Sequence, residues 1–195
     1  MKLAEPKGDV SRPILDRVKE SLFSVLYKYD LPADAVVADV FAGVGSLGLE
    51  SLSRGAQYAC FVERDPNVGR VLNQNITKTG FGERCKVTRH DAYLGGAPVD
   101  RVYGLYDLVF VDPPYPTTYV SGADSQLAGL MQVLTRQVRP DAIVSVRTHR
   151  RVTLLDRYAD FKVLDRRQWG TMAITLLALE TACWFKTDDE VRDDQ

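Results

Sequence analysis

The chain has 195 residues and a net charge of −1, with 45% apolar and 26% charged residues. This composition is typical of a soluble globular protein, and the length suits one domain with a full hydrophobic core. No apolar run approaches the length of a membrane span, and residues 1–30 contain no secretory hydrophobic segment, so we expect a cytoplasmic protein. Three widely spaced cysteines argue against a disulfide or metal framework.

The charge is unevenly distributed along the chain. Residues 187–195 contain five acids and one arginine, whereas the rest has 24 basic and 21 acidic residues, a net charge of +3. We expect this acidic tail to be disordered, and a mildly basic folded part is compatible with a nucleic-acid partner without requiring one. The predicted organisation is an N-terminal segment with an amphipathic helix (1–30), a main domain (31–186) and the tail (187–195).

The first predicted element is the amphipathic helix. Ser11 is a candidate cap, Pro13 suits the first turn, and residues 31–34 end the helix. One face is apolar and consists of Ile14, Val18, Leu22, Val25, Leu26 and Tyr29. Basic residues off that face are either solvated or candidates for contact with nucleic acid, and these are Arg12, Arg17 and Lys19.

The stretch from Val36 to Gly48 predicts a buried strand, a glycine turn and a helix. An apolar run, Val36–Val40, leads to Gly43 and Gly45, and apolar residues at helical spacing follow. Gly43 permits a tight turn, Gly45 lets a ligand approach the backbone, and Gly48 allows the helix to pack closely on the strand. Such a stretch opens a nucleotide-binding βαβ unit.

The glycine spacing also matches the pattern G-x-G-x-x-G, so a nicotinamide or flavin site has to be considered. An ordinary strand–helix turn would explain the glycines alone. However, Glu63 follows a second apolar run, Tyr58–Val62, at a place where an acid can hold two ribose hydroxyls. The glycines and Glu63 together favour a nucleotide site.

The rest of the chain continues the alternation of helices and strands. Helices are predicted from Pro66 to about Lys78, ended by Gly80, and over residues 124–138. The remaining strands are predicted at 85–89, 106–111, 142–146, 161–164 and 172–179. The last two form an antiparallel hairpin, because Gly170 joins them without room for a helix. The predicted fold class is α/β, with a seven-stranded, mostly parallel sheet, this hairpin at one edge, and helices on both faces.

Ligands of such sheets bind beyond the carboxyl ends of the strands. The predicted strand ends carry polar or glycine residues that would meet at one edge: the segment from Asp39 to Gly45, Glu63, Asp91, and the segment from Asp112 to Tyr115. This convergence predicts the site more strongly than any one motif.

The most specific motif is Asp112-Pro113-Pro114-Tyr115, directly after the fourth predicted strand. The prolines have no amide N–H, so carbonyls of this turn can face a ligand without competition. The Asp112 carboxylate and such a carbonyl are both acceptors, and together they suit the two hydrogens of an exocyclic base amine. Tyr115 offers a surface on which the base can stack.

An aromatic amine is a weak nucleophile because its lone pair is delocalised into the ring. Two acceptors that hold its hydrogens favour a pyramidal nitrogen whose lone pair points outward. Such a nitrogen needs an electrophilic carbon rather than a hydride, and the methyl group of a sulfonium cofactor fits without a metal or a covalent nucleophile. Catalysis would consist mainly of positioning, which can contribute roughly 7–11 kcal/mol.

The sequence resembles a known family at three places. Phe41–Gly45 together with Asp112–Tyr115 is similar to S-adenosylmethionine-dependent amino-methyltransferases of the class I Rossmann-like fold. Arg12–Phe23 and Leu47–Ala56 resemble the RsmD-type guanine-N2 methyltransferases, which modify 16S ribosomal RNA in the small subunit. The similarity covers about residues 11–180.

The resemblance implies a role for each site residue. The cofactor S-adenosylmethionine would contact Asp39, Phe41, Ala42, Gly43 and Gly45. Glu63, with Arg64 beside it, would hold the ribose, and Asp91 with Ala92 would face the adenine. Asp112, Pro113, Pro114 and Tyr115 would carry the target amine.

The sequence departs from the family pattern near its start. A short glycine- and arginine-rich β segment that usually precedes the Arg-Pro helix is absent or eroded, and Ile14 and Leu15 stand where threonine is usual. The acidic tail is also uncommon in the family. These differences concern the RNA contacts more than the chemistry.

A second basic group follows the fifth predicted strand and is either a phosphate-binding surface or a solvated one: Arg147, Arg150, Arg151, Arg157, Arg166 and Arg167. His90 and His149 lack metal-like spacing, so we expect structural or surface roles and no metal. The target base must leave any helical stack to reach Asp112, and a loop or unpaired end of a structured RNA lowers that cost.

The preferred hypothesis is an enzyme that methylates ribosomal RNA or a small-subunit assembly particle and works as a monomer. A DNA adenine-N6 methyltransferase is the first alternative, since the Asp112 motif suits that amine too, although so short a chain shows no DNA-recognition domain. A ribosome-assembly factor that binds RNA without turnover is the second. A dehydrogenase fits less well because the motif would then have no task.

Overall fold

The computed structural model describes residues 3–4 and 16–185. The predicted helix start at Ser11 and Pro13, the basic residue Arg12 and the acidic tail lie outside the described residues.

One mixed sheet organises the described part of the chain. Its strands are β1 (Val36–Val40), β2 (Tyr58–Val62), β3 (Cys85–Thr88), β4 (Tyr106–Val111), β5 (Val138–His149), β6 (Arg157–Tyr158), β7 (Phe161–Trp169) and β8 (Met172–Leu179). The spatial order is β3-β2-β1-β4-β5-β8-β7-β6. The first five strands pair in parallel, and β8, β7 and β6 pair antiparallel.

This architecture confirms the predicted Rossmann-like α/β fold with a C-terminal antiparallel hairpin. The number of strands was wrong, because the sheet has eight strands rather than seven. The additional strand, β6, has only two residues and adds to the edge of β7. So short a segment has no alternating pattern that a sequence could reveal.

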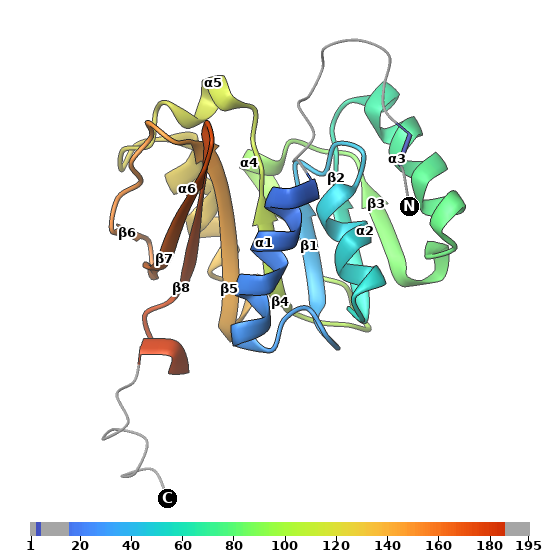
Figure 1. Cartoon of the computed structure of the whole chain (residues 1–195), viewed down its shortest axis with the longest axis horizontal. Coiled ribbons are helices and arrows are strands. Elements are labelled where there is room, and N and C mark those ends of the chain that lie inside the picture. The colour runs from blue at the N-terminus through green and yellow to red at the C-terminus, as the bar shows by residue number, and fades with distance from the viewer. Residues whose placement is uncertain (1–2, 5–15, 186–195) are drawn as a thin grey trace, which may run out of the picture.

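Helices cover both faces of the sheet (Figure 1). On one face lie α1 (Asp16–Leu26), α2 (Ser46–Ser53) and α3 (Pro66–Thr79), which pack on Val37, Leu108 and Ile143. On the other lie α4 (Ala92–Gly95) and α6 (Gln126–Leu134), against Val36, Val109 and Val144. Because both faces are covered, every residue of β1 and β2 is buried, which explains their continuous apolar runs.

Short helical segments complete the fold. A four-residue helix, α5 (Tyr115–Thr118), follows β4 at the carboxyl edge of the sheet. Three 3₁₀ turns lie at Tyr27–Tyr29, Gly82–Arg84 and Cys183–Phe185. None of the helices in the described ranges is long and apolar enough to cross a membrane.

The boundaries of α3 follow from its terminal residues. The Asp65 side chain accepts hydrogen bonds from the N–H groups of Asn67 and Val68, at 2.7 and 3.1 Å, and Pro66 occupies the first turn. Gly80 ends the helix with a φ of +74°, as predicted.

The helix predicted over 124–138 is shorter than expected. Ser125 caps α6 by accepting a hydrogen bond from the N–H of Ala128 at 3.1 Å, and the helix ends at Leu134. Val138 already belongs to β5, where it pairs with Tyr106. Pairing between strands therefore determines this boundary.

Candidate active site

The carboxyl ends of β1 to β5 lie at the upper edge of the sheet in Figure 1. The spatial order of the strands determines the order of the residues that follow them. From β3 to β4 these are Asp91, Glu63, the glycine loop and Asp112, and Arg147 lies beside Asp112 near the carboxyl end of β5. The structure thus brings the predicted acids and glycines to one edge.

The glycine loop, which we define as residues 41–45, is a tight turn. Two of its N–H groups bond to carbonyl oxygens, with Ala42 donating to Val62 at 2.9 Å and Gly45 to Ala42 at 2.8 Å. Phe41 has a φ of +69°, a left-handed conformation that is uncommon for a bulky residue and that clusters at functional sites.

The glycines have different surroundings. A Cβ added to Gly43 would meet no atom within 4 Å, so open space lies beside this residue. A Cβ at Gly45 would lie 2.5 Å from Leu72 Cδ1, and one at Gly48 would lie 2.3 Å from the Phe61 ring. The predicted packing role of Gly48 fits this geometry. Leu72 occupies the side of Gly45 on which a Cβ would stand, which gives a packing reason for this glycine, and the approach of a ligand to Gly45 stays a prediction.

Asp39 is buried on β1 and joins it to α2. The side chain is 2% exposed, and Oδ2 accepts a hydrogen bond from the N–H of Gly48 at 2.8 Å. Burial raises the pKa of Asp39 to about 8, despite that hydrogen bond, and the charges of Asp112 and Glu63 act in the same direction.

Glu63 anchors the glycine loop from the end of β2. Its Oε2 accepts the N–H of Gly43 at 3.0 Å, and its Oε1 accepts the N–H of Asp65 at 2.8 Å. A carboxylate has about four lone-pair sites, so each oxygen keeps capacity to accept a ribose hydroxyl. The geometry therefore fits the predicted role.

The segment after β3 is held in place by Asp91. Its Oδ1 accepts the N–H of Tyr93 at 3.0 Å, and Oδ2 lies 3.4 Å from Arg64 Nη1. Ala92 is buried, and the rings of Phe41 and Tyr93 lie 4.7 Å apart. Residues from three strand ends thus form one continuous surface.

Asp112 forms an ion pair with Arg147 of β5. Arg147 Nε donates to Asp112 Oδ1, and the side chains are 11% and 17% exposed, respectively. Burial raises the pKa of Asp112, and the charge and hydrogen bond of Arg147 oppose this rise. The sequence groups Arg147 with the phosphate-binding candidates and contains no local signal for this pair, which depends on the register of β5 against β4.

The prolines lead from β4 into α5. The Pro114 carbonyl accepts hydrogen bonds from the N–H and the hydroxyl of Thr117, at 3.0 and 2.8 Å. This carbonyl is therefore not the uncontested acceptor that the sequence predicted, which leaves that of Pro113 as the candidate. The Thr117 hydroxyl also lies 2.6 Å from the Tyr93 hydroxyl, a link between α5 and α4 for which the sequence had no signal.

The basic candidates separate into buried and exposed groups. Lys19 is 14% exposed and pairs with Asp16 and Glu50, each at 3.3 Å, so it faces protein. The exposed candidates among the described residues are Arg17, Arg150, Arg151, Arg157 and Arg167. Arg157 pairs with Glu180 and Arg167 with Asp165, which leaves Arg17, Arg150 and Arg151 as the exposed candidates outside such ion pairs in the described part of the chain.

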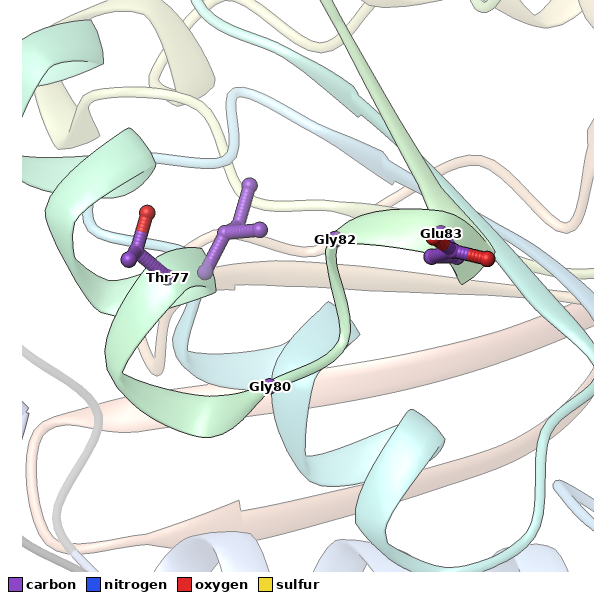
Figure 2. Close-up of a pocket in the computed structure, with 5 residues that line it drawn as sticks. Thr77, Gly80, Gly82 and Glu83 are labelled. Carbon is purple, nitrogen blue, oxygen red and sulfur yellow. The ribbon is translucent and has the colours of Figure 1, made fainter.

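A surface depression lies elsewhere, between the end of α3 and the following 3₁₀ turn. Figure 2 shows its lining by Thr77, Gly80, Gly82 and Glu83, with Ile76. This position is at the amino end of β3, the edge opposite the acids. Across the described ranges, no group of three or more His, Cys, Asp or Glu side chains could hold a metal ion.

Comparisons with known proteins agree with this geometry. Residues 1–178 match the family model described as conserved hypothetical protein 95. The chain is 34% identical to ribosomal RNA small subunit methyltransferase D of Haemophilus influenzae over 140 residues, 71% of this chain and 68% of that one. It is 27% identical over 172 residues to a Bacillus subtilis protein named as an rRNA methyltransferase, YlbH, covering 87% of this chain and 88% of that one.

A solved structure shows the same fold. It is that of an Escherichia coli protein named as methyltransferase yhhF, with a TM-score of 0.73 and 29% identity over 93% of each chain. The fold, the edge residues and the family match agree with one another. The chain therefore belongs to the family described as conserved hypothetical protein 95, the RsmD-type methyltransferases.

Proposed function

We propose that this chain transfers a methyl group from S-adenosylmethionine to an exocyclic base amine of ribosomal RNA, with guanine N2 of the small-subunit (16S) RNA as the target. One observation carries the proposal. The acceptor for the base and the loop for the cofactor adjoin, since the N–H of Asp112 donates to the carbonyl of Val40, next to the glycine loop, at 3.3 Å.

The residues of the edge fit the cofactor. Open space beside Gly43 leaves room for it, and the Glu63 carboxylate, held by backbone N–H groups, is oriented to accept ribose hydroxyls. Asp91 and Ala92 are fixed beside Tyr93, whose ring contacts that of Phe41, and this acceptor with its neighbouring rings supports adenine binding here. Arg64 supports Asp91 through their contact.

When bound, S-adenosylmethionine supplies a sulfonium methyl whose carbon–sulfur bond breaks as the carbon–nitrogen bond forms, and the amine nitrogen then loses one proton to solvent. Asp112 accepts a hydrogen bond from the amine and orients the nitrogen. The Pro113 carbonyl holds the other amine hydrogen. The stacking role predicted for Tyr115 concerns a side chain that lies outside what the structure describes. Arg17, Arg150 and Arg151 position the RNA backbone.

The relatives named as small subunit methyltransferases support ribosomal RNA as the substrate class. We extend this to an assembly particle of the small subunit, to a cytoplasmic site of action, and to a monomeric enzyme without a metal. Analytical ultracentrifugation tests the oligomeric state.

The function is tested by incubating the protein with labelled S-adenosylmethionine and, separately, immature small-subunit particles, naked ribosomal RNA and DNA. Mass spectrometry then identifies the modified nucleoside. We expect N2-methylguanosine in RNA. N6-methyladenine in DNA would indicate the DNA enzyme, and RNA binding without any transfer would indicate an assembly factor; either result overturns the proposal.

The Asp112→Ala variant is the matched inactive enzyme in this experiment. Removal of one preorganised polar group from a catalytic site typically lowers turnover by about 10²–10³-fold. We expect that loss with nearly unchanged cofactor affinity, measured by calorimetry. Near-normal turnover would show that Asp112 does not hold the amine.

A further inference from the structure

We propose that Arg147 is a positioning residue for Asp112, which it holds ionised and oriented through their buried ion pair, rather than a contact for RNA phosphates. This inference rests on the proposed function for its catalytic consequence. The ion pair itself is a property of the folded protein and can be tested without any substrate.

The register of the sheet creates the pair. Val111 of β4 lies opposite Val146 of β5, so the next residue on each strand, Asp112 and Arg147, extends from the same edge. The other side of β5 pairs with β8, where Ile174 lies opposite Arg147. The backbone from which the guanidinium extends is therefore held on both sides. Arg147 is thereby placed within the sheet and not on a mobile loop.

The burial of Arg147 argues against a phosphate contact. Its side chain is 11% exposed, and its Nε is directed at the Asp112 carboxylate. By contrast, Arg150 and Arg151, which follow β5, are exposed. Phosphate groups of a nucleic acid are reached by exposed side chains, so the two kinds of arginine have separate tasks.

The charges around Asp112 explain why it needs a positive partner. The other carboxyl groups at this edge are Asp39 on β1, Glu63 after β2 and Asp91 after β3, and the cation on the adjoining strand is Arg147. Burial favours a protonated Asp112, whereas an ionised carboxylate accepts at both oxygens and is the stronger acceptor for an amine hydrogen. Arg147 Nε donates to Oδ1, and we assign the other carboxylate oxygen to the base.

The chain contains a matched control at the other end of the same two strands. The Nε of Arg139 in β5 lies 3.4 Å from Oδ1 of Asp107 in β4, and the Arg139 side chain is 50% exposed. This pair is at the amino edge of the sheet, away from the glycine loop. Arg139→Met therefore removes an arginine from β5 without touching the proposed site.

The first experiment measures the Asp112 pKa from ¹³Cγ NMR titrations of the protein alone. Opposite charges close to a carboxyl lower its pKa by about 1–3 units, so Arg147→Met should raise the pKa of Asp112 by at least about one unit. Arg139→Met should leave it unchanged. An Asp112 pKa that is the same in the wild type and in Arg147→Met overturns the proposal, whatever the protein methylates.

The second experiment measures single-turnover methyl transfer against pH at saturating RNA. We expect Arg147→Met to lower the rate at neutral pH by about tenfold or more and to move the acidic limb of the profile upward, with unchanged cofactor affinity. Arg147→Lys keeps the charge but not the planar donor group. The acidic limb of its pH profile should therefore match that of the wild type, while its rate of methyl transfer falls. The Lys variant also serves if the Met variant does not fold.

Other outcomes have defined meanings. A raised KM for RNA and a weaker salt dependence, with an unmoved pH profile, would assign Arg147 to phosphate binding and overturn the proposal. Loss of thermal stability with a normal rate and profile would leave only a structural role and overturn it as well. Absence of methyl transfer in the wild type would refute the proposed function, and the NMR titration would still decide the role of Arg147.

Discussion

Two carboxyl groups lie at the edge where a charged cofactor and a base would meet. Asp39 is buried on β1, and the partly buried Asp112 directly follows the adjacent strand β4. Asp112 has a cation on the next strand, whereas Asp39 has the N–H of Gly48. The charges of Asp112 and Glu63 raise the pKa of Asp39, whereas the charge of Arg147 opposes the rise that burial causes at Asp112. The edge therefore combines a carboxyl that is held ionised with one that tends to stay protonated.

The stability of the protein should record the state of Asp39. Its pKa is raised to about 8, so between pH 4 and 8 the folded protein holds a proton that the unfolded chain has released. Stability must then fall as pH rises, by about 1.4 kcal/mol per pH unit for this group. Urea unfolding at several pH values should therefore show that the free energy of unfolding of Asp39→Asn rises relative to that of the wild type as the pH increases to about 8.

Asp34→Asn is the control for this substitution. It makes the same change from a carboxylate to an amide, but at an exposed residue just before β1. A difference between Asp39→Asn and the wild type that does not vary with pH would contradict the raised pKa of Asp39.

Glu63→Ala should weaken the binding of S-adenosylmethionine. A hydrogen bond to a charged group contributes about 1.5–3 kcal/mol, so the loss corresponds to roughly 10–100-fold in the dissociation constant. Isothermal titration calorimetry measures it, with Glu83→Ala, in the remote depression of Figure 2, as the control. Equal affinity in Glu63→Ala and wild type would refute the ribose assignment.

At the scale of elements, the contact between α2 and the sheet depends on a missing side chain. A Cβ at Gly48 would lie 2.3 Å from the Phe61 ring and 3.2 Å from Asp39 Cβ. Gly48→Ala should therefore destabilise the protein by about 1–3 kcal/mol, the usual cost of overpacking. Gly129→Ala in α6, where the added Cβ meets nothing within 4 Å, should instead stabilise it by about 0.5–1 kcal/mol. Denaturant titration distinguishes the two, and equal effects would rule out the packing explanation.

Most elements could be predicted because their signals are local. Apolar runs indicate β1 and β2. The start of α3 is marked by the capping residue Asp65 and by Pro66, and its end by Gly80, which adopts a left-handed conformation. The short elements β6, α4 and α5 could not be predicted, since two to four residues contain no periodicity.

Contacts between distant segments were also hidden from the sequence. Asn75 lies on α3, and its side chain joins two distant segments. Its Oδ1 accepts the N–H of Ala4 at 2.8 Å, and its Nδ2 donates to the carbonyls of Ala4 and Val44, each at 3.1 Å. The pairing of Arg147 with Asp112 likewise depends on the register of β5 against β4. The edge that carries the site was predictable from topology, but the partners of its side chains were not.

At the scale of the molecule, the exposed arginines after β5 lie near the edge that carries Asp112. Removing one arginine that binds a phosphate lowers the slope of log affinity against log salt by about 0.7 for single-stranded nucleic acid. We expect this change for Arg150→Ala and for Arg151→Ala in RNA-binding titrations. Arg101→Ala is the control, in the turn that precedes β4 at the opposite edge, and it should keep the wild-type slope. If all three variants show the same slope, Arg150 and Arg151 do not bind RNA phosphates.

The placement of β8 has a consequence for how the protein is made. This strand comes after every other strand in the chain, yet it lies between β5 and β7 inside the sheet. While a ribosome is still synthesising the chain, β5 has an unpaired side until Met172–Leu179 have emerged. A nascent chain that stalls before Met172 would present the strand that bears Arg147 as an open template, which other chains can join.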